Sequence, residues 1–447
     1  MPNRVCIAAL ALGAAMACTF ARPASAQSGA NCPAELPAQT RCFIGKDGNG
    51  AHYWIALPAQ WNGVLVVHAH GGPRLAPVDE NSSVEDLVRF SVIVEQGFAW
   101  AGSSYRRPGY GVRMAAEDTE NLRQIFVKTF GRPKRTLMHG QSWGGNVAAK
   151  GIELYANNGD GTRNYDGALI TSGLIAGATR AYLHRADLRS VYQYYCNNHP
   201  RSDEPAYPLW MGLPADSKMT AEELAARVNE CTGAQLPAAQ RSDAQRRKLA
   251  DIAAVIRIPE SSLLSHLDWA TFMFRDLVQL RLGGRNPFSN RQVEYRGSSD
   301  DKALNAGVAR FDADQGAVAE LARDGDLTGK VSIPILTMHA VGDPTAFVEH
   351  EAAYRDTLIG AGTQASLVQT FTSEALHSKL ATPQYAATLQ ALMEWIDSGT
   401  RPTPQHIANL CAQHARKYPG GCHYLPEFKP QPFFWRAYPR SLPPRPR

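Results

Sequence analysis

The sequence has few of the features that mark a membrane protein, a metal site or a nucleotide site. Beyond residue 26 it contains no run of about 18 apolar residues, the length that a membrane-spanning helix needs. It has no C-x-x-C pair, no H-E-x-x-H motif and no Walker-type phosphate loop. A segment at 158–162 is similar to a calcium loop, but it is followed by Arg163 where such a loop requires glycine. We therefore expect no membrane span in the mature chain, no metal and no cofactor.

A large excess of one charge is also missing from most of the chain. The formal net charge is +5 at pH 7, and segment 401–447 accounts for it, because there Lys and Arg are opposed only by Glu427. This segment is rich in proline and also contains aromatic residues. We expect a solvated strap that lies over the globule, with binding to an anionic surface as the alternative, and no nucleic-acid partner.

The first 26 residues have the pattern of a secretory signal. Arg4 precedes an apolar run, and Ala24-Ser25-Ala26 provides the small residues of a cleavage site. The run is too short and too rich in alanine for a membrane anchor, and Ala15 disfavours lipid attachment at Cys18. We expect cleavage after residue 26 and a secreted or periplasmic protein.

Signal removal leaves six cysteines. Export makes disulfides the expected state, with free buried thiols as the alternative. The short spacings favour three local pairs, which are Cys32 with Cys42, Cys196 with Cys231, and Cys411 with Cys422.

Strand and helix patterns alternate in two parts of the chain. Continuous apolar runs at 64–70, 98–103, 135–139 and 167–172 are typical of strands buried on both faces of a parallel sheet, and helical patterns separate them. A strand at 333–339, a helix at 348–360, a strand at 365–371 and a helix at 383–398 resume the alternation. The class is α/β. We expect a core formed by 27–173 and 331–400, a helical cap inserted at 174–330, and the strap 401–447.

One pentapeptide indicates a nucleophile. Residues 140–144 read Gly-Gln-Ser-Trp-Gly between a predicted strand and a helix of small residues, and this context places Ser142 on a nucleophile elbow. We expect Gly140 and Gly144 to be required because a Cβ at either site would clash with the strained seryl residue.

A seryl nucleophile needs a base, and the base needs a carboxylate to fix its tautomer. Asp343 and His377 each follow a late predicted strand, in the chain order Ser, acid, His. The alternatives are a turn role for Asp343 and a surface-loop role for His377. Glu349 and His350 compete for these functions, but both fall within a predicted helix rather than at a strand end.

Two backbone N–H groups are expected to bind the oxyanion of the tetrahedral intermediate. One belongs to Trp143, directly after the nucleophile. The other is assigned to Gly72 in the run His70-Gly71-Gly72-Pro73, because proline has no N–H. A simple glycine turn is the alternative for this run. Other histidines in or next to strands are expected to pack or to support the site, namely His68, His70, His139 and His339.

These motifs resemble those of the α/β-hydrolase superfamily, over about residues 40–173 and 331–400. The His-Gly-Gly-Pro run is similar to the oxyanion loop of prolyl aminopeptidases, although Arg74 stands where that motif continues with glycine. The resemblance implies a mostly parallel sheet flanked by helices, with a helical cap inserted after the sixth strand.

The sequence thus predicts a secreted serine hydrolase that cleaves a small-molecule or oligomeric carboxylic ester through a Ser-His-Asp acyl-enzyme mechanism. Trp269 and Phe272 indicate an apolar or aromatic acyl pocket in the cap, with packing inside the cap as the alternative. The second reading is an exopeptidase similar to prolyl aminopeptidases, although the cap has no clear acidic cluster to hold a substrate amine. The third is a binding protein that kept the fold.

Overall fold

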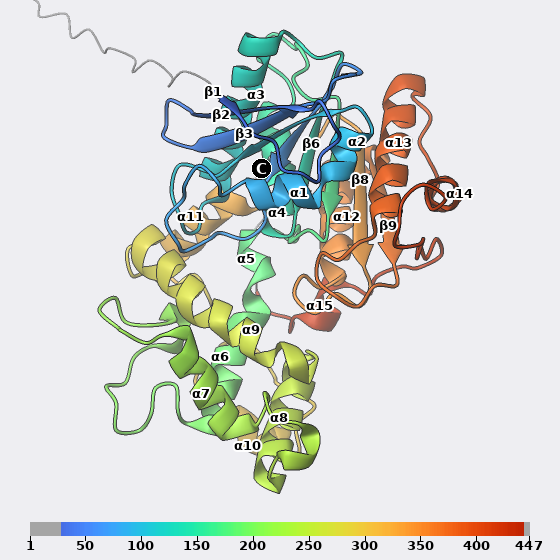
Figure 1. Ribbon diagram of the computed structural model, residues 1–447. Helices are drawn as coiled ribbons and strands as arrows, with labels where there is room; N and C mark the ends of the chain where they lie inside the picture. The colour runs from blue at the N-terminus through green and yellow to red at the C-terminus, as the bar shows by residue number, and fades with distance from the viewer. Residues whose placement is uncertain (1–27, 442–447) are drawn as a thin grey trace, which may run out of the picture.

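A nine-stranded sheet forms the centre of the larger of two lobes (Figure 1). The computed structural model describes residues 28–441, so the predicted signal peptide lies outside the described residues. The sheet has the strand order β1-β2-β3-β5-β4-β6-β7-β8-β9. The strands are β1 Ser28–Ala30, β2 Arg41–Lys46, β3 His52–Leu57, β4 Val64–Ala69, β5 Ala99–Ser103, β6 Arg135–Gln141, β7 Gly167–Thr171, β8 Ile335–Ala340 and β9 Leu367–Thr372.

Most neighbouring strands of this sheet are parallel. The pairs from β5 and β4 through to β9 run parallel, whereas β1, β2, β3 and β5 pair antiparallel. The burial of strand β4 on both faces explains why its sequence is continuously apolar. Leu65 and Val67 belong to the core on one face of the sheet, and Val64 and Val66 belong to the core on the other. Each face therefore needs its own layer of helices.

Helices form those two layers. Side chains of α3, α4 and α12 contribute to the first core, and those of α2, α13 and α14 to the second. The α-helices are α1 Val84–Arg89, α2 Ser91–Glu95, α3 Val112–Phe130, α4 Trp143–Tyr155, α5 Ala178–Ala181, α6 Leu183–Cys196, α7 Ala221–Thr232, α8 Asp243–Ile256, α9 Leu263–Asp268, α10 Asp301–Gly307, α11 Gln315–Gly325, α12 Glu349–Ala361, α13 Thr382–Ser398, α14 Pro404–His414 and α15 Phe433–Arg436. In the described residues, no helix combines the length and the apolarity that crossing a bilayer requires.

The chain between β7 and β8 contains only helices and loops. Helices α6 to α10 build the smaller lobe, which has its own hydrophobic core (Figure 1). Residues at the two ends of this stretch, such as Ala178 and Leu321, and residues in its middle, such as Phe274, instead join the first core of the sheet. The stretch that the sequence assigns to a cap thus packs against both the sheet and itself.

Residues 262–282 have helical periodicity in the sequence, but the structure there is more irregular. Helix α9 continues into two π-helical segments, Trp269–Met273 and Asp276–Arg281. A π-turn inserts one extra residue and rotates the side chains that follow, and such turns often occur at functional sites. Trp269 is the first residue of the first π-segment.

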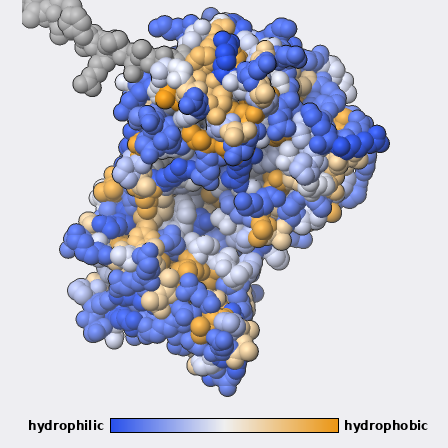
Figure 2. All heavy atoms as spheres, in the orientation of Figure 1, coloured by the Kyte–Doolittle hydropathy of each residue, from blue (hydrophilic) through white to orange (hydrophobic). Residues whose placement is uncertain are grey.

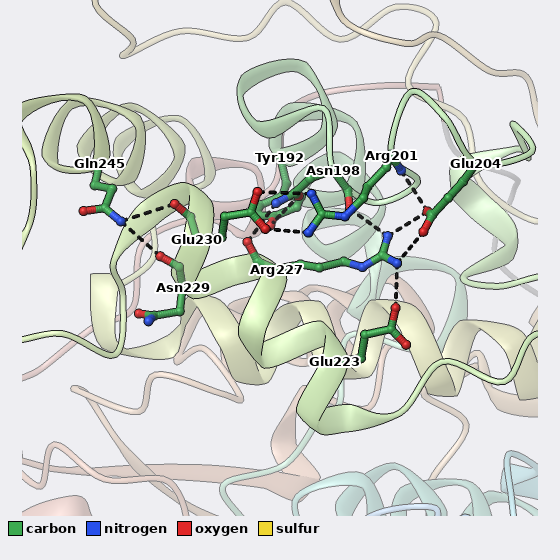
Figure 3. A network of polar contacts seen from close by, with 9 residues as sticks. All are labelled: Tyr192, Asn198, Arg201, Glu204, Glu223, Arg227, Asn229, Glu230 and Gln245. Atoms are coloured by element: carbon green, nitrogen blue, oxygen red, sulfur yellow. Dashed lines mark hydrogen bonds and ion pairs between the residues drawn. The ribbon is translucent and has the colours of Figure 1, made fainter.

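The smaller lobe is held together by a disulfide and by a network of ion pairs. Cys196 at the end of α6 is joined to Cys231 on α7, and the other two disulfides are Cys32–Cys42 and Cys411–Cys422. These are the pairs that the spacing favours. Figure 3 shows Arg227 donating to the carbonyl of Asn198 at 2.9 Å, to Glu204 at 2.7 Å and to Glu223 at 2.6 Å. This network holds the loop after α6 against α7.

The strap is more firmly attached than a solvated segment would be. Residues 423–425 make backbone hydrogen bonds to Phe371 and Ser373 at the edge of β9. Farther along, Tyr438 is buried and donates to the carbonyl of Val255 at 2.7 Å. Arg440 forms an ion pair with the buried Asp187 of α6. The strap therefore connects the sheet edge to the smaller lobe.

Candidate active site

Ser142 lies at the sharp turn between β6 and α4. Its backbone has φ 59° and ψ −124°, a conformation that costs a non-glycine residue on the order of 1–3 kcal/mol. Three backbone hydrogen bonds hold this turn, one of which runs from the N–H of Leu174 to the carbonyl of Ser142 at 3.0 Å. The N–H of Ser142 donates to the carbonyl of Thr171 at 3.0 Å, and the N–H of Gly145 donates to the carbonyl of Ser142 at 2.9 Å. The turn therefore fixes the seryl residue at the carboxyl end of β6.

The two glycines of the pentapeptide are needed for a reason that differs from the predicted one. A Cβ on Gly140 would lie 2.2 Å from the carbonyl oxygen of Gly144, and a Cβ on Gly144 would lie 2.2 Å from that of Ala69. The crowding is therefore with the backbone of α4 and with the end of β4, rather than with Ser142 itself. This close approach also brings the loop after β4 next to the elbow.

The structure brings Ser142, His377 and Asp343 into one hydrogen-bonded chain. The Ser142 hydroxyl lies 2.8 Å from Nε2 of His377, and Nδ1 of the same ring lies 2.7 Å from Oδ2 of Asp343. The three residues follow β6, β9 and β8, which are parallel, so all of them reach the same edge of the sheet. With Nδ1–H donating to the carboxylate, Nε2 is free to accept the seryl proton.

Asp343 is buried and is held in its ionised form. Its Oδ1 accepts the N–H groups of Thr345 at 2.8 Å and Ala346 at 2.9 Å, and its Oδ2 faces His377. Burial alone would raise its pKa. The hydrogen bond and charge of His377, together with the charge of His339, outweigh that effect and lower the pKa of Asp343 below its ordinary value.

Glu349 and His350, the alternatives to Asp343 and His377, have other partners. His350 is buried, and its Nδ1 accepts the N–H of Ala176 at 3.2 Å. Glu349 forms an ion pair with Arg436 of the strap. His339 is bonded to Glu351 at 3.2 Å and to the carbonyl of Ala346 at 2.7 Å, so it supports the loop that carries Asp343.

A set of contacts that no sequence pattern marks links the elbow to the loop of His377. Gln141, directly before the nucleophile, donates to the hydroxyl of Ser378, directly after His377. Arg89 on α1 donates to the carbonyl of Ser378, and to the side chain of Gln141 at 3.3 Å. Ser378 has φ 58°, so its conformation needs this support. These contacts fix the position of the His377 ring relative to Ser142.

Gly72 and Trp143 lie on the two segments that meet at the elbow. Gly72 has φ +74°, which glycine adopts without strain. Among the described residues, apart from Gly72 and its two chain neighbours, no atom lies within 4 Å of the site of a Cβ. Gly71 is crowded, because its Cβ would lie 2.8 Å from Oε1 of Gln141. The side chain of Trp143 is buried, with its ring centroid 5.9 Å from Tyr105 and 5.8 Å from Tyr110.

A buried acid holds the loop after β4. Asp86 of α1 accepts from Nδ1 of His70 and lies 3.2 Å from Nε2 of His68. Burial would raise the pKa of Asp86, but the charges and hydrogen bonds of His68 and His70 lower it well below its ordinary range. His68 in turn lies 3.0 Å from the ring nitrogen of His139 on β6. The strand histidines therefore connect and support the site, as the sequence analysis expected of them.

The topology now identifies the fold. A mostly parallel sheet is covered by helices on both faces, the elbow follows β6, and the acid and the histidine follow the last two strands. The chain has the α/β-hydrolase fold. No protein-family model matches it.

The comparisons with known proteins fall into two kinds. Over 122 residues, 27% of this chain and 25% of the relative, the sequence is 28% identical to an o-phthalyl amidase of Xanthobacter agilis, so the match spans only a quarter of that protein. Among solved structures, a feruloyl esterase B from Aspergillus oryzae aligns at 11% identity and TM-score 0.42, covering 85% of this chain and 88% of its own. Lipase A of Candida antarctica aligns at 11% identity and TM-score 0.42, covering 88% and 90%.

Two buried histidines next to the site predict a loss of stability in acid. Burial first, and then the charge of Arg185, lowers the pKa of His266 to about 3, while burial and the charge of His339 lower that of His350 to about 3. Between pH 6.5 and 3 the unfolded chain therefore binds more protons than the folded one at these positions. Stability is complete above pH 6.5 and falls as the pH decreases, by about 1.4 kcal/mol per pH unit for each histidine.

Urea unfolding at pH 7, 6 and 5 measures this slope. His266→Gln should reduce the slope by about one proton, whereas His406→Gln, at an exposed position of α14, should leave it unchanged. An unchanged slope in the His266 variant would contradict the assignment.

Proposed function

We propose that this protein is a serine hydrolase that cleaves carboxylic esters through an acyl-enzyme. The observation that carries the proposal is the hydrogen-bonded chain from Ser142 through His377 to Asp343. The backbone of Ser142 is strained at the elbow, and its hydroxyl contacts the base His377, which an ionised carboxylate orients. Nucleophilic attack of a seryl hydroxyl on a carbonyl requires this arrangement.

In the first half of the reaction, Oγ of Ser142 attacks the carbonyl carbon while Nε2 of His377 takes the hydroxyl proton. Asp343 keeps the ring in the required tautomer and stabilises the imidazolium. The N–H groups of Trp143 and Gly72 bind the oxyanion, and the tetrahedral intermediate collapses when His377 protonates the departing alcohol. Water then enters, loses a proton to His377 and attacks the acyl carbon. The second tetrahedral intermediate collapses as His377 returns that proton to Oγ of Ser142, which releases the acid and restores the free serine and the neutral imidazole.

The charges at the junction between the lobes support an ester over a substrate with a free amine. Three buried carboxylates there are already paired with arginine, namely Asp187 with Arg440, Asp276 with Arg281, and Glu349 with Arg436. These carboxylates are thus not available to hold an ammonium group. Trp269, which is half-buried and stacks on the buried Tyr182, contributes aromatic surface at this junction, while Phe272 packs against the core of the smaller lobe.

Amide hydrolysis is the second candidate. The sequence match to an o-phthalyl amidase and the His70–Pro73 run, which is similar to that of prolyl aminopeptidases, both favour it. The amine of an amide leaves less easily than the alcohol of an ester. Amide cleavage therefore demands firmer substrate binding and protonation of the departing amine in the site. We also propose that the protein acts outside the cytoplasm, since the sequence begins with a signal-like segment and the structure contains three disulfides.

A panel of p-nitrophenyl esters with acyl chains of increasing size, measured beside amino-acid p-nitroanilides, tests the proposal. We expect the highest kcat/KM for an ester with an apolar or aromatic acyl group. Faster cleavage of proline p-nitroanilide than of every ester would instead establish the exopeptidase. No turnover of either class would contradict the proposed hydrolase.

A further inference from the structure

Arg185 is a buried guanidinium without a counter-ion. It lies on the first turn of α6, and the residue is 1% exposed. Its Nε contacts Nδ1 of His266 at 3.3 Å, and its Nη1 is buried with no hydrogen-bond partner. Within residues 28–441 no carboxylate forms an ion pair with it. A buried charge in this state is costly, because burial removes water without providing an acceptor.

Other arginines near the junction between the lobes do have acceptors for their terminal nitrogens. Arg189, one turn farther along α6, donates from both terminal nitrogens to the carbonyl of His199 at 3.2 Å. Arg440 is paired with Asp187, and Arg436 with Glu349. The Nε of Arg189 is also buried without a partner, but both of its terminal nitrogens have an acceptor, whereas the terminal Nη1 of Arg185 has none.

Two aromatic rings lie beside this guanidinium. Its Cζ lies 4.5 Å from the ring centroid of Trp269 and 5.7 Å from that of Tyr182. The two rings are stacked on each other at 4.2 Å with an interplanar angle of 17°. Trp269 is half-buried and begins the π-helical segment, so its outer part is accessible. The surface is hollowed between the two lobes in Figure 2.

Two paths of contacts place Arg185 beside the triad. On one side, Nε2 of His266 donates to the carbonyl of Pro344 at 2.8 Å, and Pro344 directly follows Asp343. On the other side, Tyr182 packs at 5.8 Å on Tyr110, which packs at 5.8 Å on Trp143, the neighbour of Ser142. Contacts thus connect the guanidinium both to the loop of the acid and to the helix of the nucleophile.

We propose that Arg185 binds a carboxylate of the substrate, and that the preferred substrates are esters bearing a second, free carboxylate on an aromatic ring. This inference rests on the proposed ester hydrolysis. The carboxylate accepts from Nη1, which satisfies the unused donor and neutralises the buried charge. The substrate ring packs against Trp269, while the ester carbonyl extends toward Ser142. Arg185 accordingly sets specificity by charge, and the aromatic rings set it by shape.

Matched substrates separate this role from a structural one. The p-nitrophenyl esters of 3- and 4-carboxybenzoic acid carry the extra charge, and that of 4-methylbenzoic acid is a neutral counterpart. In the wild type, kcat/KM for at least one charged ester should exceed that of the neutral ester by about tenfold or more. Arg185→Gln should reduce this ratio by at least about tenfold, mainly through KM, and Arg185→Lys should retain part of it.

Binding without turnover provides an independent measurement. In a Ser142→Ala background, calorimetry with the monomethyl ester of terephthalic acid should detect binding that Arg185→Gln weakens by about tenfold. An unchanged ratio of charged to neutral turnover in Arg185→Gln, or equal binding to both proteins, overturns the role of Arg185. Failure of the wild type to cleave even the neutral ester counts against the proposed function instead, and the calorimetry then still decides whether Arg185 binds an anion.

Discussion

Replacing Ser142 by alanine is expected to abolish ester hydrolysis, with a loss of about a million-fold in kcat. The Oγ atom forms the covalent bond to the acyl group, and neither His377 nor a water molecule at its position can replace it in that step. A fluorophosphonate that labels activated serines should react with the wild type and leave the alanine variant unlabelled. Residual turnover near the wild-type rate would show that the nucleophile lies elsewhere.

The same variant should keep its fold. The hydrogen bonds that hold the elbow involve the backbone of Ser142, and alanine retains them. The φ of 59° strains alanine and serine alike, so the melting temperature should change little. Ser373→Ala, at an exposed position after β9, is a matched control that should remain fully active and should still react with the fluorophosphonate.

The sequence predicts the sheet well because its central strands are buried on both faces. Such strands are continuously apolar, and this pattern differs from those of helices and half-exposed strands. The expected strand at 64–70 corresponds to β4 at Val64–Ala69, and that at 135–139 lies within β6. At the sheet edge the signal fails. The short strand β1 is mostly exposed, and a 3₁₀ turn at Gln364–Ser366 delays the start of β9.

The candidate site could be predicted where a residue follows directly from local geometry. An elbow needs glycines beside its serine, and the acid and the base must follow late strands. The sequence alone can therefore predict these positions. The contact of Gln141 with Ser378 joins residues far apart in the chain, and no local pattern marks it. Arg185 was missed for a related reason, because a sequence shows an arginine on an amphipathic helix but not whether tertiary contacts leave it unpaired.

The strap shows how burial changes the interpretation of charge. A basic, proline-rich tail reads as solvated, yet Arg436 and Arg440 pair with acids of the sheet lobe and the smaller lobe. The partners Glu349 and Asp187 are buried and distant in sequence. Part of the positive charge of the strap is therefore neutralised within the chain and is not available to an external partner. These ion pairs stabilise the junction between the lobes.

The second large effect is expected at the other two members of the hydrogen-bonded chain. In Asp343→Asn, one side-chain atom becomes a donor facing Nδ1 of His377. The ring then carries its proton on Nε2 and can no longer accept from Ser142, which should cost about 10⁴-fold in kcat. The amide oxygen can still accept from Thr345 and Ala346, so the loop should keep its conformation.

His377→Ala removes the base itself and should reduce kcat at least as much as Asp343→Asn does. His350→Gln should keep kcat within about tenfold of the wild type, because His350 contacts Ala176 rather than Ser142. Groups that act as one unit are not additive, so Ser142→Ala combined with His377→Ala should be no slower than Ser142→Ala alone. Initial rates with the best p-nitrophenyl ester measure all five variants. An inactive His350 variant beside an active His377 variant would mean that the base was assigned to the wrong strand end, and additive losses in the double variant would mean that Ser142 and His377 act in separate steps.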